Sequence, residues 1–266
     1  MNRRTFLALL LTAACGNAQP QPLVLATTTS VEDSGLLDEL IPAFEAEYPQ
    51  YAMRALAVGS GQAFELGRRG DVDILITHAP AQERAFVQEG HGAQAIPIMH
   101  NRFVVIGPPE DPAGISTATS AADAFLRIAA TVETFVSRGD SSGTHTRERA
   151  IWQAAGIDPT EADWYTEAGV GMGDALRYAG ERDSHTLSDR ATFVVVGPTT
   201  GLSILVDLPG DTLLHNPYSV TAVTNARNAQ GALIFVSWIT SAETQGMVGR
   251  YRAGADGAGL FLPATR

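Results

Sequence analysis

The chain has 266 residues and a formal net charge of -11 at pH 7, and all 18 of its basic residues are arginines. This acidic balance argues against a nucleic-acid partner, because such partners need a basic surface. The absence of lysine excludes Schiff-base chemistry and phosphate binding through a Walker-type loop. The single cysteine, Cys15, has no partner for a disulfide, so stability must come from buried apolar side chains.

The first residues have the features of an export signal, which we assign to residues 1–19. Arg3 and Arg4 precede an uncharged apolar run that is too short to span a bilayer. The arginine pair resembles a twin-arginine signal. Cys15 follows Thr12-Ala13-Ala14, which resembles a lipoprotein cleavage box. We therefore predict a periplasmic protein, and the sequence leaves open whether a lipid on Cys15 tethers it to the membrane.

A strand, a hydroxyl-rich loop and a helix open the first part of the chain. Leu23 to Ala26 has the apolar character of a buried strand, and it runs directly into Thr27-Thr28-Thr29-Ser30. Apolar side chains then recur at helical spacing between Leu36 and Phe44. A second such unit has its turn at Gly59-Ser60-Gly61. Strands that alternate with helices imply a parallel sheet, and in such sheets ligands bind beyond the carboxyl ends of the strands.

The remaining periodic segments continue this alternation. We predict further strands and helices over residues 53–58, 62–69, 71–76, 81–89, 96–99, 103–106, 121–129, 132–136, 147–155, 219–223 and 232–240. Thr192 to Val196 is predicted as another buried strand. Gly107 to Pro112 has the glycine and prolines of a lobe boundary. We therefore expect one lobe from residues 20–106 and 215–266, a second lobe from residues 107–214, and a hinged cleft between them.

The stretch from Ser137 to His145, Ser-Arg-Gly-Asp-Ser-Ser-Gly-Thr-His, lies between an apolar run and a predicted helix. A strand that turns through glycine and hydroxyl residues into a helix leaves free backbone N–H groups at the positive end of the helix dipole. Arg138 adds a permanent cation, and Ser142 and Thr144 add hydroxyl donors, so the stretch suits an oxyanion. A simpler interpretation is that Asp140 and Ser142 cap the helix while Arg138 pairs with a carboxylate.

Four motifs follow one another along the chain, and they are Thr27-Thr28-Thr29-Ser30, residues 137–145, Thr186-Leu187-Ser188-Asp189-Arg190-Ala191-Thr192-Phe193 and Asn216-Pro217-Tyr218-Ser219-Val220. Together they resemble the tungstate-binding proteins of bacterial ABC importers over nearly all of the chain beyond the signal. The resemblance implies a type II periplasmic binding protein, with two α/β lobes that each contain a mainly parallel sheet flanked by helices. The ligand would lie in the cleft between the lobes.

The resemblance also implies a function and partners. Such a protein binds tungstate, and often molybdate, and delivers it to a membrane permease driven by an ATPase. It is not an enzyme, it has no cofactor beyond the oxyanion that it carries, and we expect it to be a monomer. No catalytic residue and no site for a free metal ion are expected.

The motifs assign the oxyanion-binding residues, which are Thr28, Thr29, Ser30, Ser60, Gly61, Arg138, Ser142, Gly143, Thr144, Met172 and Gly173. Thr29 and Ser30 are the favoured donors of the first loop. Asp140 and His145 are expected to orient the donors, because a carboxylate that pointed at a dianion would repel it.

Several alternatives stay open at this point. Tungstate, molybdate and sulfate are fully ionised at neutral pH and only accept hydrogen bonds, whereas phosphate carries a proton that needs an acceptor. The sequence leaves open whether Asp140 or Asp189 supplies that acceptor, so a receptor for molybdate, sulfate or phosphate is the main alternative. A serine hydrolase that uses Ser142 and His145 is disfavoured because no Gly-x-Ser-x-Gly elbow surrounds the serine. A sensor without a permease is a further alternative, and the six histidines lack the spacing of metal ligands.

Overall fold

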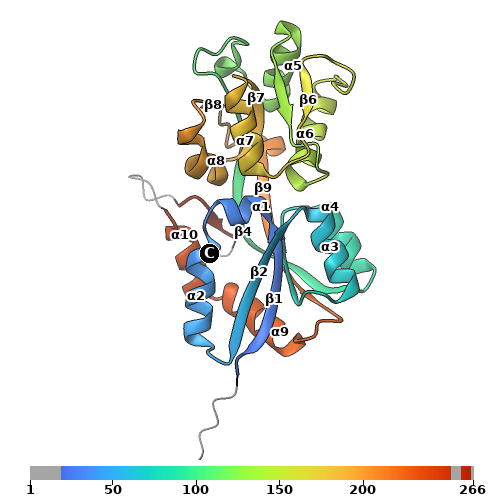
Figure 1. The fold of residues 1–266 in the computed structure, drawn as a ribbon, viewed down its shortest axis with the longest axis vertical. Helices are drawn as coiled ribbons and strands as arrows, with labels where there is room; N and C mark the ends of the chain where they lie inside the picture. Colours follow the sequence, from blue (N-terminus) through green and yellow to red (C-terminus); the bar gives the residue numbers. More distant parts are fainter. Residues whose placement is uncertain (1–18, 253–258, 265–266) are drawn as a thin grey trace, which may run out of the picture.

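The computed structural model of the protein describes residues 19–252 and 259–264. Two lobes lie one above the other along the long axis of the molecule (Figure 1). Residues 1–18, which include Cys15 and nearly all of the predicted export signal, lie outside the described part of the chain. No helix of the described residues is long and apolar enough to cross a membrane.

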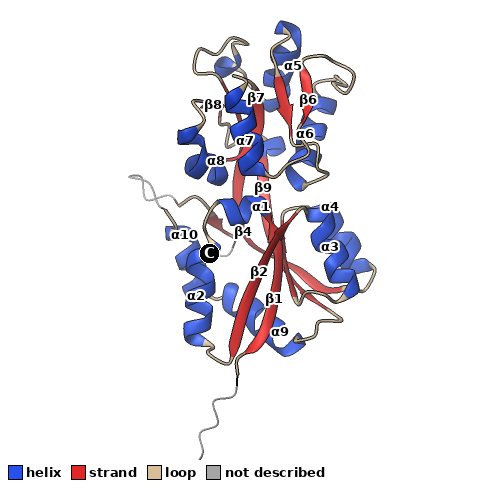
Figure 2. Ribbon diagram, in the orientation of Figure 1, coloured by secondary structure: helices blue, strands red, loops and turns tan. Residues whose placement is uncertain are grey.

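The first lobe is built on a sheet with the strand order β2-β1-β3-β9-β4, which is mixed rather than mainly parallel as expected, because β9 returns antiparallel between β3 and β4. Its strands are β1 (Gln21–Thr28), β2 (Tyr51–Val58), β3 (Ile74–Thr77), most of β4 (Gly92–Gly107), β9 (His215–Val223) and the short β10 (Leu262–Pro263). β1 pairs in parallel with β2 and β3, and β9 is antiparallel to both β3 and β4. The helices of this lobe are α1 (Thr29–Asp33), α2 (Leu37–Glu47), α3 (Ser60–Arg69), α4 (Pro80–Gln88), α9 (Ala229–Ile239) and α10 (Ala242–Arg250) (Figure 2).

Both faces of this sheet are buried, as the alternation along β1 shows. Leu23 and Leu25 belong to a core cluster that includes Phe44 of α2 and Phe235 of α9. Ala26 belongs to a second cluster, which includes side chains of α3 and α4. Since successive side chains of a strand point to opposite faces, these helices cover both faces of the sheet, which explains the uninterrupted apolar run in the sequence.

The second lobe contains a smaller sheet, which is also mixed rather than mainly parallel. Its strands are β5 (Phe135–Ser137), β6 (Tyr165–Glu167), β7 (His185–Asp189), β8 (Ser203–Val206) and the end of β4. β5 pairs in parallel with β6 and β7, whereas β4 is antiparallel to β7 and β8. Its helices are α5 (Ala121–Thr131), α6 (Gly143–Ala154), α7 (Met172–Glu181) and α8 (Arg190–Val196), with 3-10 turns η1 (Ile115–Thr117), η2 (Gly197–Thr199) and η3 (Thr212–Leu214).

β4 and β9 connect the two lobes (Figure 1). The sequence predicted two separate strands over residues 96–99 and 103–106, but β4 is one continuous strand of 16 residues. Its residues up to Arg102 pair with β9, and those from Phe103 onward pair with β7 and β8. We propose that the boundaries of the lobes lie close to the expected ones. The chain would pass between the lobes at Arg102 and Phe103 in β4 and again at the start of β9.

The prediction of a buried strand over Thr192 to Val196 was wrong, because this run lies in helix α8. The side chain of Asp189, at the end of β7, accepts a hydrogen bond from the Thr192 backbone N–H at 3.0 Å and caps the helix. β4 and β5 already pair with the two edges of β7, so no position beside it is left for another strand. The apolar side chains of Phe193 and Val196 pack instead into a cluster with those of α7.

The core of the second lobe contains a buried carboxyl group, that of Glu148 on α6. Its Oε1 atom accepts hydrogen bonds from Trp152 Nε1 at 3.1 Å and from the Tyr165 hydroxyl at 2.8 Å. Burial raises the pKa of Glu148 from its ordinary value of 4.5 to about 7. The folded protein therefore disfavours the ionised form of this side chain.

We expect Glu148→Gln to stabilise the protein more at pH 8 than at pH 5. The unfolded chain ionises Glu148 near pH 4.5, whereas the folded chain retains the proton until about pH 7, so the wild type loses stability as pH rises through this interval. The glutamine keeps an oxygen for Trp152 and Tyr165. Urea unfolding should show that the gain at pH 8 exceeds the gain at pH 5 by about 2 kcal/mol.

The exposed Glu161 offers a matched control in the same lobe. Glu161→Gln should change stability little at either pH. Equal effects of Glu148→Gln at the two pH values would contradict the assignment of a raised pKa.

Candidate functional site

Three loops of the first lobe meet at the edge of the sheet that faces the second lobe. Because β1, β2 and β3 are parallel, their carboxyl ends lie at the same edge. Helix α1 begins at Thr29 directly after β1, α3 begins at Ser60 after β2, and His78 follows β3. Ser60 and His78 are buried. The predicted donors of the first lobe are therefore brought together by strand order.

The second lobe contributes the loop from Arg138 to Ser142, between β5 and α6. The Ser142 hydroxyl caps α6 by accepting a hydrogen bond from the His145 backbone N–H at 3.2 Å. Asp140 pairs with Arg138 through one carboxylate oxygen and accepts from the Ser142 N–H at 3.1 Å through the other. The capping and pairing considered from the sequence are thus both present, and they shape the loop around the guanidinium.

The backbone conformation and the close packing of this loop require a glycine at position 139. Its φ angle is +61°, in the left-handed region that favours glycine. A Cβ atom added to it would lie 2.6 Å from Cβ of Glu167. The neighbouring Ser141 N–H donates to Nδ1 of His145 at 3.0 Å, so His145 also holds the loop in place.

Arg138 lies at the point where the two lobes meet, and its side chain is only 2% exposed. Its guanidinium donates to the Thr29 hydroxyl of the first lobe at 3.3 Å and to the Thr144 hydroxyl of the second at 3.4 Å. Its Nε donates to the Val170 carbonyl at 3.4 Å. These bonds are longer than typical N–H to oxygen hydrogen bonds. The guanidinium therefore retains donor capacity for a stronger acceptor such as an oxyanion.

Ser60 has an unused hydroxyl in this region. The residue is fully buried, and its Oγ has no hydrogen-bond partner in the part of the chain that the structure describes. A buried hydroxyl without a partner costs free energy, so it indicates a ligand that completes the hydrogen bonding. The hydroxyls of Thr28 and Ser30 lie 3.1 Å apart and bond to each other.

Helix α7 presents its N-terminus to the first lobe. The Met172 backbone N–H lies 3.5 Å from the Thr29 hydroxyl, and the Gly173 N–H donates to the carboxylate of Asp33 at 3.0 Å. Both expected residues are therefore at the boundary between the lobes, but in this conformation their N–H groups are directed at side chains. Their contact with a ligand stays a prediction.

Each of the other expected residues also lies at this boundary. Gly61 is in the first turn of α3, and the preceding Gly59 lies close to the Asp140 carbonyl, 3.9 Å from the position of an added Cβ. Gly143 and Thr144 form the first turn of α6 and are buried. The expected donors thus come together from four segments.

Two carboxylates considered as acceptors for a phosphate proton are engaged by protein donors. Asp140 binds Arg138 and the Ser142 N–H. Asp189 is fully buried and accepts from the Thr192 hydroxyl at 2.6 Å and from the Asn101 amide at 3.2 Å. These contacts disfavour both carboxylates as partners of a bound hydrogen phosphate.

Sequence reasoning missed His78, which is 4% exposed at the carboxyl end of β3. Its Nδ1 lies 2.8 Å from Oδ1 of Asn216, and the Asn216 amide donates to Asn101 and to the Tyr218 hydroxyl. Oδ1 of Asn216 is therefore an acceptor, and Nδ1 of His78 must carry the proton. Burial lowers the pKa of His78 to about 4, so the ring is neutral at pH 7.

His78 also contacts the second lobe. A Cβ atom added to Gly143 would lie 2.9 Å from the His78 ring, so the ring packs directly against the start of α6. The one signal in the sequence was its position, because His78 follows a buried parallel strand just as Thr29 and Ser60 do.

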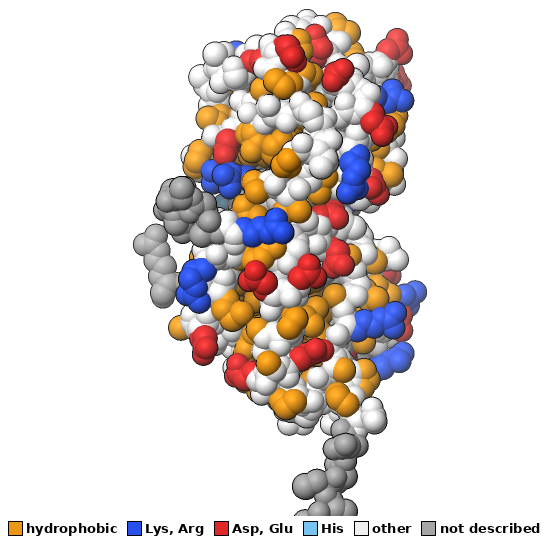
Figure 3. Space-filling view, turned by 60° about the vertical axis from the view of Figure 1, so that its left-hand side comes forward, with side chains coloured by type: hydrophobic (Ala, Val, Ile, Leu, Met, Phe, Trp, Pro, Cys, Tyr) orange, Lys and Arg blue, Asp and Glu red, His pale blue; other side chains and the backbone are white. Residues whose placement is uncertain are grey.

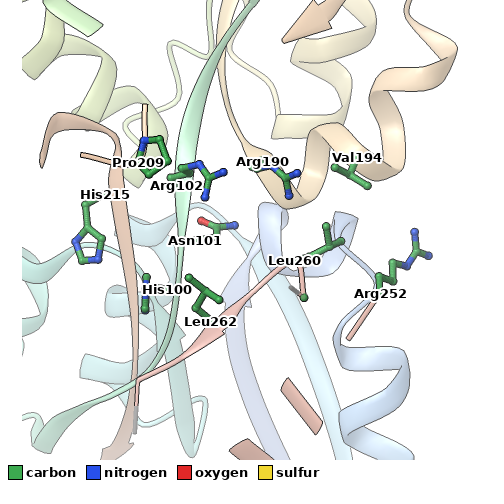
Figure 4. Close-up of a pocket in the computed structure, with 11 residues that line it drawn as sticks. His100, Asn101, Arg102, Arg190, Val194, Pro209, His215, Arg252, Leu260 and Leu262 are labelled. Carbon is green, nitrogen blue, oxygen red and sulfur yellow. The ribbon is translucent and has the colours of Figure 1, made fainter. Parts of the chain in front are cut away.

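A separate cavity of about 320 Å³ lies beside the connecting strands (Figure 4). Asn101 and Asn216 are paired across β4 and β9 and bond to each other on the His78 side, so the next pair, Arg102 and His215, points the opposite way. The cavity is lined by His100, Asn101, Arg102, Arg190, Val194, Pro209, His215, Arg252, Gly259, Leu260 and Leu262.

The cavity includes none of the expected oxyanion-binding residues. Figure 3 shows basic side chains at the junction of the lobes. Arg102 and Arg190 both pair with Asp207, which offsets part of their charge. Arg252 and Gly259 in the wall flank residues 253–258, which lie outside the described residues. The cavity is thus distinct from the site at the strand ends.

Two lobes joined by two strands, with hydrogen-bond donors from both lobes at their boundary, define a solute-binding protein of the periplasmic type. The model of the PBP superfamily domain matches residues 14–243. The tungstate-binding protein TupA of Peptoclostridium acidaminophilum is 39% identical, over 97% of this chain and 94% of its own length. The chain therefore belongs to the PBP superfamily and, within it, to the family of the TupA proteins.

Solved structures agree with this assignment. The tungstate ABC transporter structure from Geobacter sulfurreducens has 41% identity and a TM-score of 0.79, and covers 86% of this chain and 98% of its own. The tungstate-binding protein TupA from Desulfovibrio alaskensis G20 has 38% identity and a TM-score of 0.76, over 92% of this chain and all of its own. The resemblance and the two-lobed α/β fold expected from the sequence are confirmed.

We expect Gly143→Ala to weaken the contact between the lobes. The new methyl group would overlap the His78 ring, and overpacking of this kind costs about 1–3 kcal/mol. The lobes can relieve the overlap by separating, so small-angle scattering of the ligand-free protein should show a larger radius of gyration. Gly61→Ala is the control, because a Cβ there meets nothing within 4 Å. Equal radii for the two variants would rule out a direct packing role for Gly143.

Proposed function

We propose that the protein binds tungstate outside the cytoplasm and delivers it to an ABC importer. The observation that carries the proposal is the buried guanidinium of Arg138, which bonds to Thr29 of one lobe and Thr144 of the other. A tetrahedral dianion placed there would receive donors from both lobes and would stabilise their closed arrangement. The names of the related proteins support the choice of tungstate.

Electrostatics supports an anion at this boundary in spite of the net charge of -11. The N-termini of α3, α6 and α7, at Ser60, Gly143 and Met172, all start at the edge between the lobes. The dipoles of these helices favour negative charge near their N-termini over a short range. Because Asp140 offsets part of the charge of Arg138, the hydroxyl and N–H donors must supply much of the binding free energy. Selectivity then rests on aimed donors and on the size of the site.

The arrangement does not favour hydrolase chemistry. The Ser142 hydroxyl accepts from the His145 backbone, and Nδ1 of His145 accepts from the Ser141 N–H. Within the described residues, the Ser142 hydroxyl and the His145 ring therefore form no serine–histidine pair. We propose a binding function without a catalytic residue or a cofactor, in which tungstate is the cargo.

The proposal extends to location and partners. A periplasmic receptor of this family would hand its ligand to a permease and its ATPase, and we propose that it acts as a monomer. Whether Cys15 carries a lipid tether is decided by mass spectrometry of the exported protein. A receptor for molybdate, sulfate or phosphate is the alternative, since the donors at this boundary fit all tetrahedral oxyanions.

The first test is calorimetric titration of the chain without its signal, refolded to remove bound ligand, with tungstate, molybdate, sulfate and phosphate. We expect one-to-one binding of tungstate that is tighter than that of sulfate and phosphate by about tenfold or more, because the site must discriminate by size. Tight binding of sulfate or phosphate alone would move the protein to the alternative class. No binding by a folded protein would refute the proposed function.

We expect Arg138→Ala to weaken tungstate binding by about 2–5 kcal/mol, because a desolvated dianion would lose its main countercharge. The matched control is Arg149→Ala on α6, since Arg149 pairs with the exposed Asp158. Both variants should be compared by calorimetry at one ionic strength. Near-native affinity of Arg138→Ala would remove Arg138 from the site.

A further inference from the structure

Helix α7 lacks a cap of its own. Its N-cap residue is Gly171, and no N-cap side chain bonds to its first turn in the described structure. The carboxylate of Asp33 takes this role, because its Oδ2 accepts the Gly173 N–H at 3.0 Å. Asp33 is the last residue of α1 in the first lobe, whereas α7 belongs to the second. A carboxylate at a helix N-terminus stabilises the helix both by this bond and by its charge.

We propose that Asp33 is a positioning residue that favours the closed arrangement of the lobes by capping α7 from the opposite lobe. This inference rests on the proposed function, because it concerns how the ligand is retained. Asp33 and Gly173 are 140 positions apart in the chain, and their bond exists only while the lobes are together. When the lobes separate, the Asp33 carboxylate no longer caps α7, and water replaces it as the partner of the Gly173 N–H.

The bond from the Gly173 N–H to Asp33 is the shortest of the described hydrogen bonds between α1 and the second lobe. The Thr192 hydroxyl donates to the Ser30 carbonyl at 3.2 Å, Arg138 donates to Thr29 at 3.3 Å, and the Met172 N–H reaches Thr29 at 3.5 Å. Of the groups that the first lobe contributes to these contacts, only Asp33 is charged. An ionised acceptor makes this bond stronger than one between neutral groups of the same length.

The charged groups that face Asp33 are Arg138, Arg177 and Asp174. Burial raises the pKa of Asp33, while the Gly173 N–H and the two arginines favour its ionised form. A negative charge near the binding boundary also repels a dianion. Asp33 thus has two opposing effects, since its acceptor oxygen favours closure and its charge disfavours the ligand. A test must separate the acceptor from the charge.

Comparison of Asp33→Ala with Asp33→Asn makes this separation. Both variants remove the charge, but only asparagine keeps an oxygen that can accept the Gly173 N–H. Tungstate release should be followed by stopped-flow tryptophan fluorescence. A retained hydrogen bond should make release from Asp33→Asn slower than from Asp33→Ala by about threefold to tenfold. In the ligand-free state, Asp33→Ala should have the larger radius of gyration by small-angle scattering.

Glu181→Ala is the matched control, because Glu181 is an exposed acid at the opposite end of α7. It should release tungstate at the rate of the wild type. Equal release rates and equal radii for Asp33→Ala and Asp33→Asn would overturn the inference. If the wild type binds no tungstate, the proposed function fails, and the radii of the ligand-free variants still decide whether Asp33 favours closure.

Discussion

The buried guanidinium of Arg138 is the interaction on which the rest of the site depends. A cation can be removed from water only where acceptors replace its hydration, and no single segment of the chain supplies enough of them. Its acceptors come from Asp140 in its own loop, from Thr144 at the start of α6, from the Val170 carbonyl, and from Thr29 in the other lobe. Thr29 contributes to this set only while the lobes are in contact, and a dianion between them would strengthen the same arrangement.

The connecting strands carry a polar network that links this site to the hinge. Asn101 of β4 and Asn216 of β9 bond to each other, and they reach His78 on one side and Asp189 on the other. Asp189 in turn caps α8 through Thr192. Apart from Nε2 of His78, which has no partner among the described residues, the side-chain polar atoms of this network are hydrogen-bonded, which gives the crossing a defined geometry.

Local patterns in the sequence predicted the units around Thr29, Ser60 and Arg138, because apolar runs followed by hydroxyl and glycine residues mark a strand that turns into a helix. The same reasoning failed for residues 192–196, where a run of apolar residues predicted a strand. These residues form a helix, which the side chain of Asp189 caps. β6 and β8, with three and four residues, were not predicted since they are too short to show a period. Their pairing is set by neighbouring strands.

The sequence by itself determined the types of donor, their order along the chain and the class of ligand, since arginine, hydroxyl and glycine residues at helix starts can serve an oxyanion wherever they meet. Only the tertiary structure decided which groups meet. His78 is hydrogen-bonded to Asn216, which is 138 positions away in the chain, and Asp33 is hydrogen-bonded to Gly173, which is 140 positions away. No periodicity reports such pairs, because periodicity reflects burial within one element, whereas these contacts arise from how two lobes fit together.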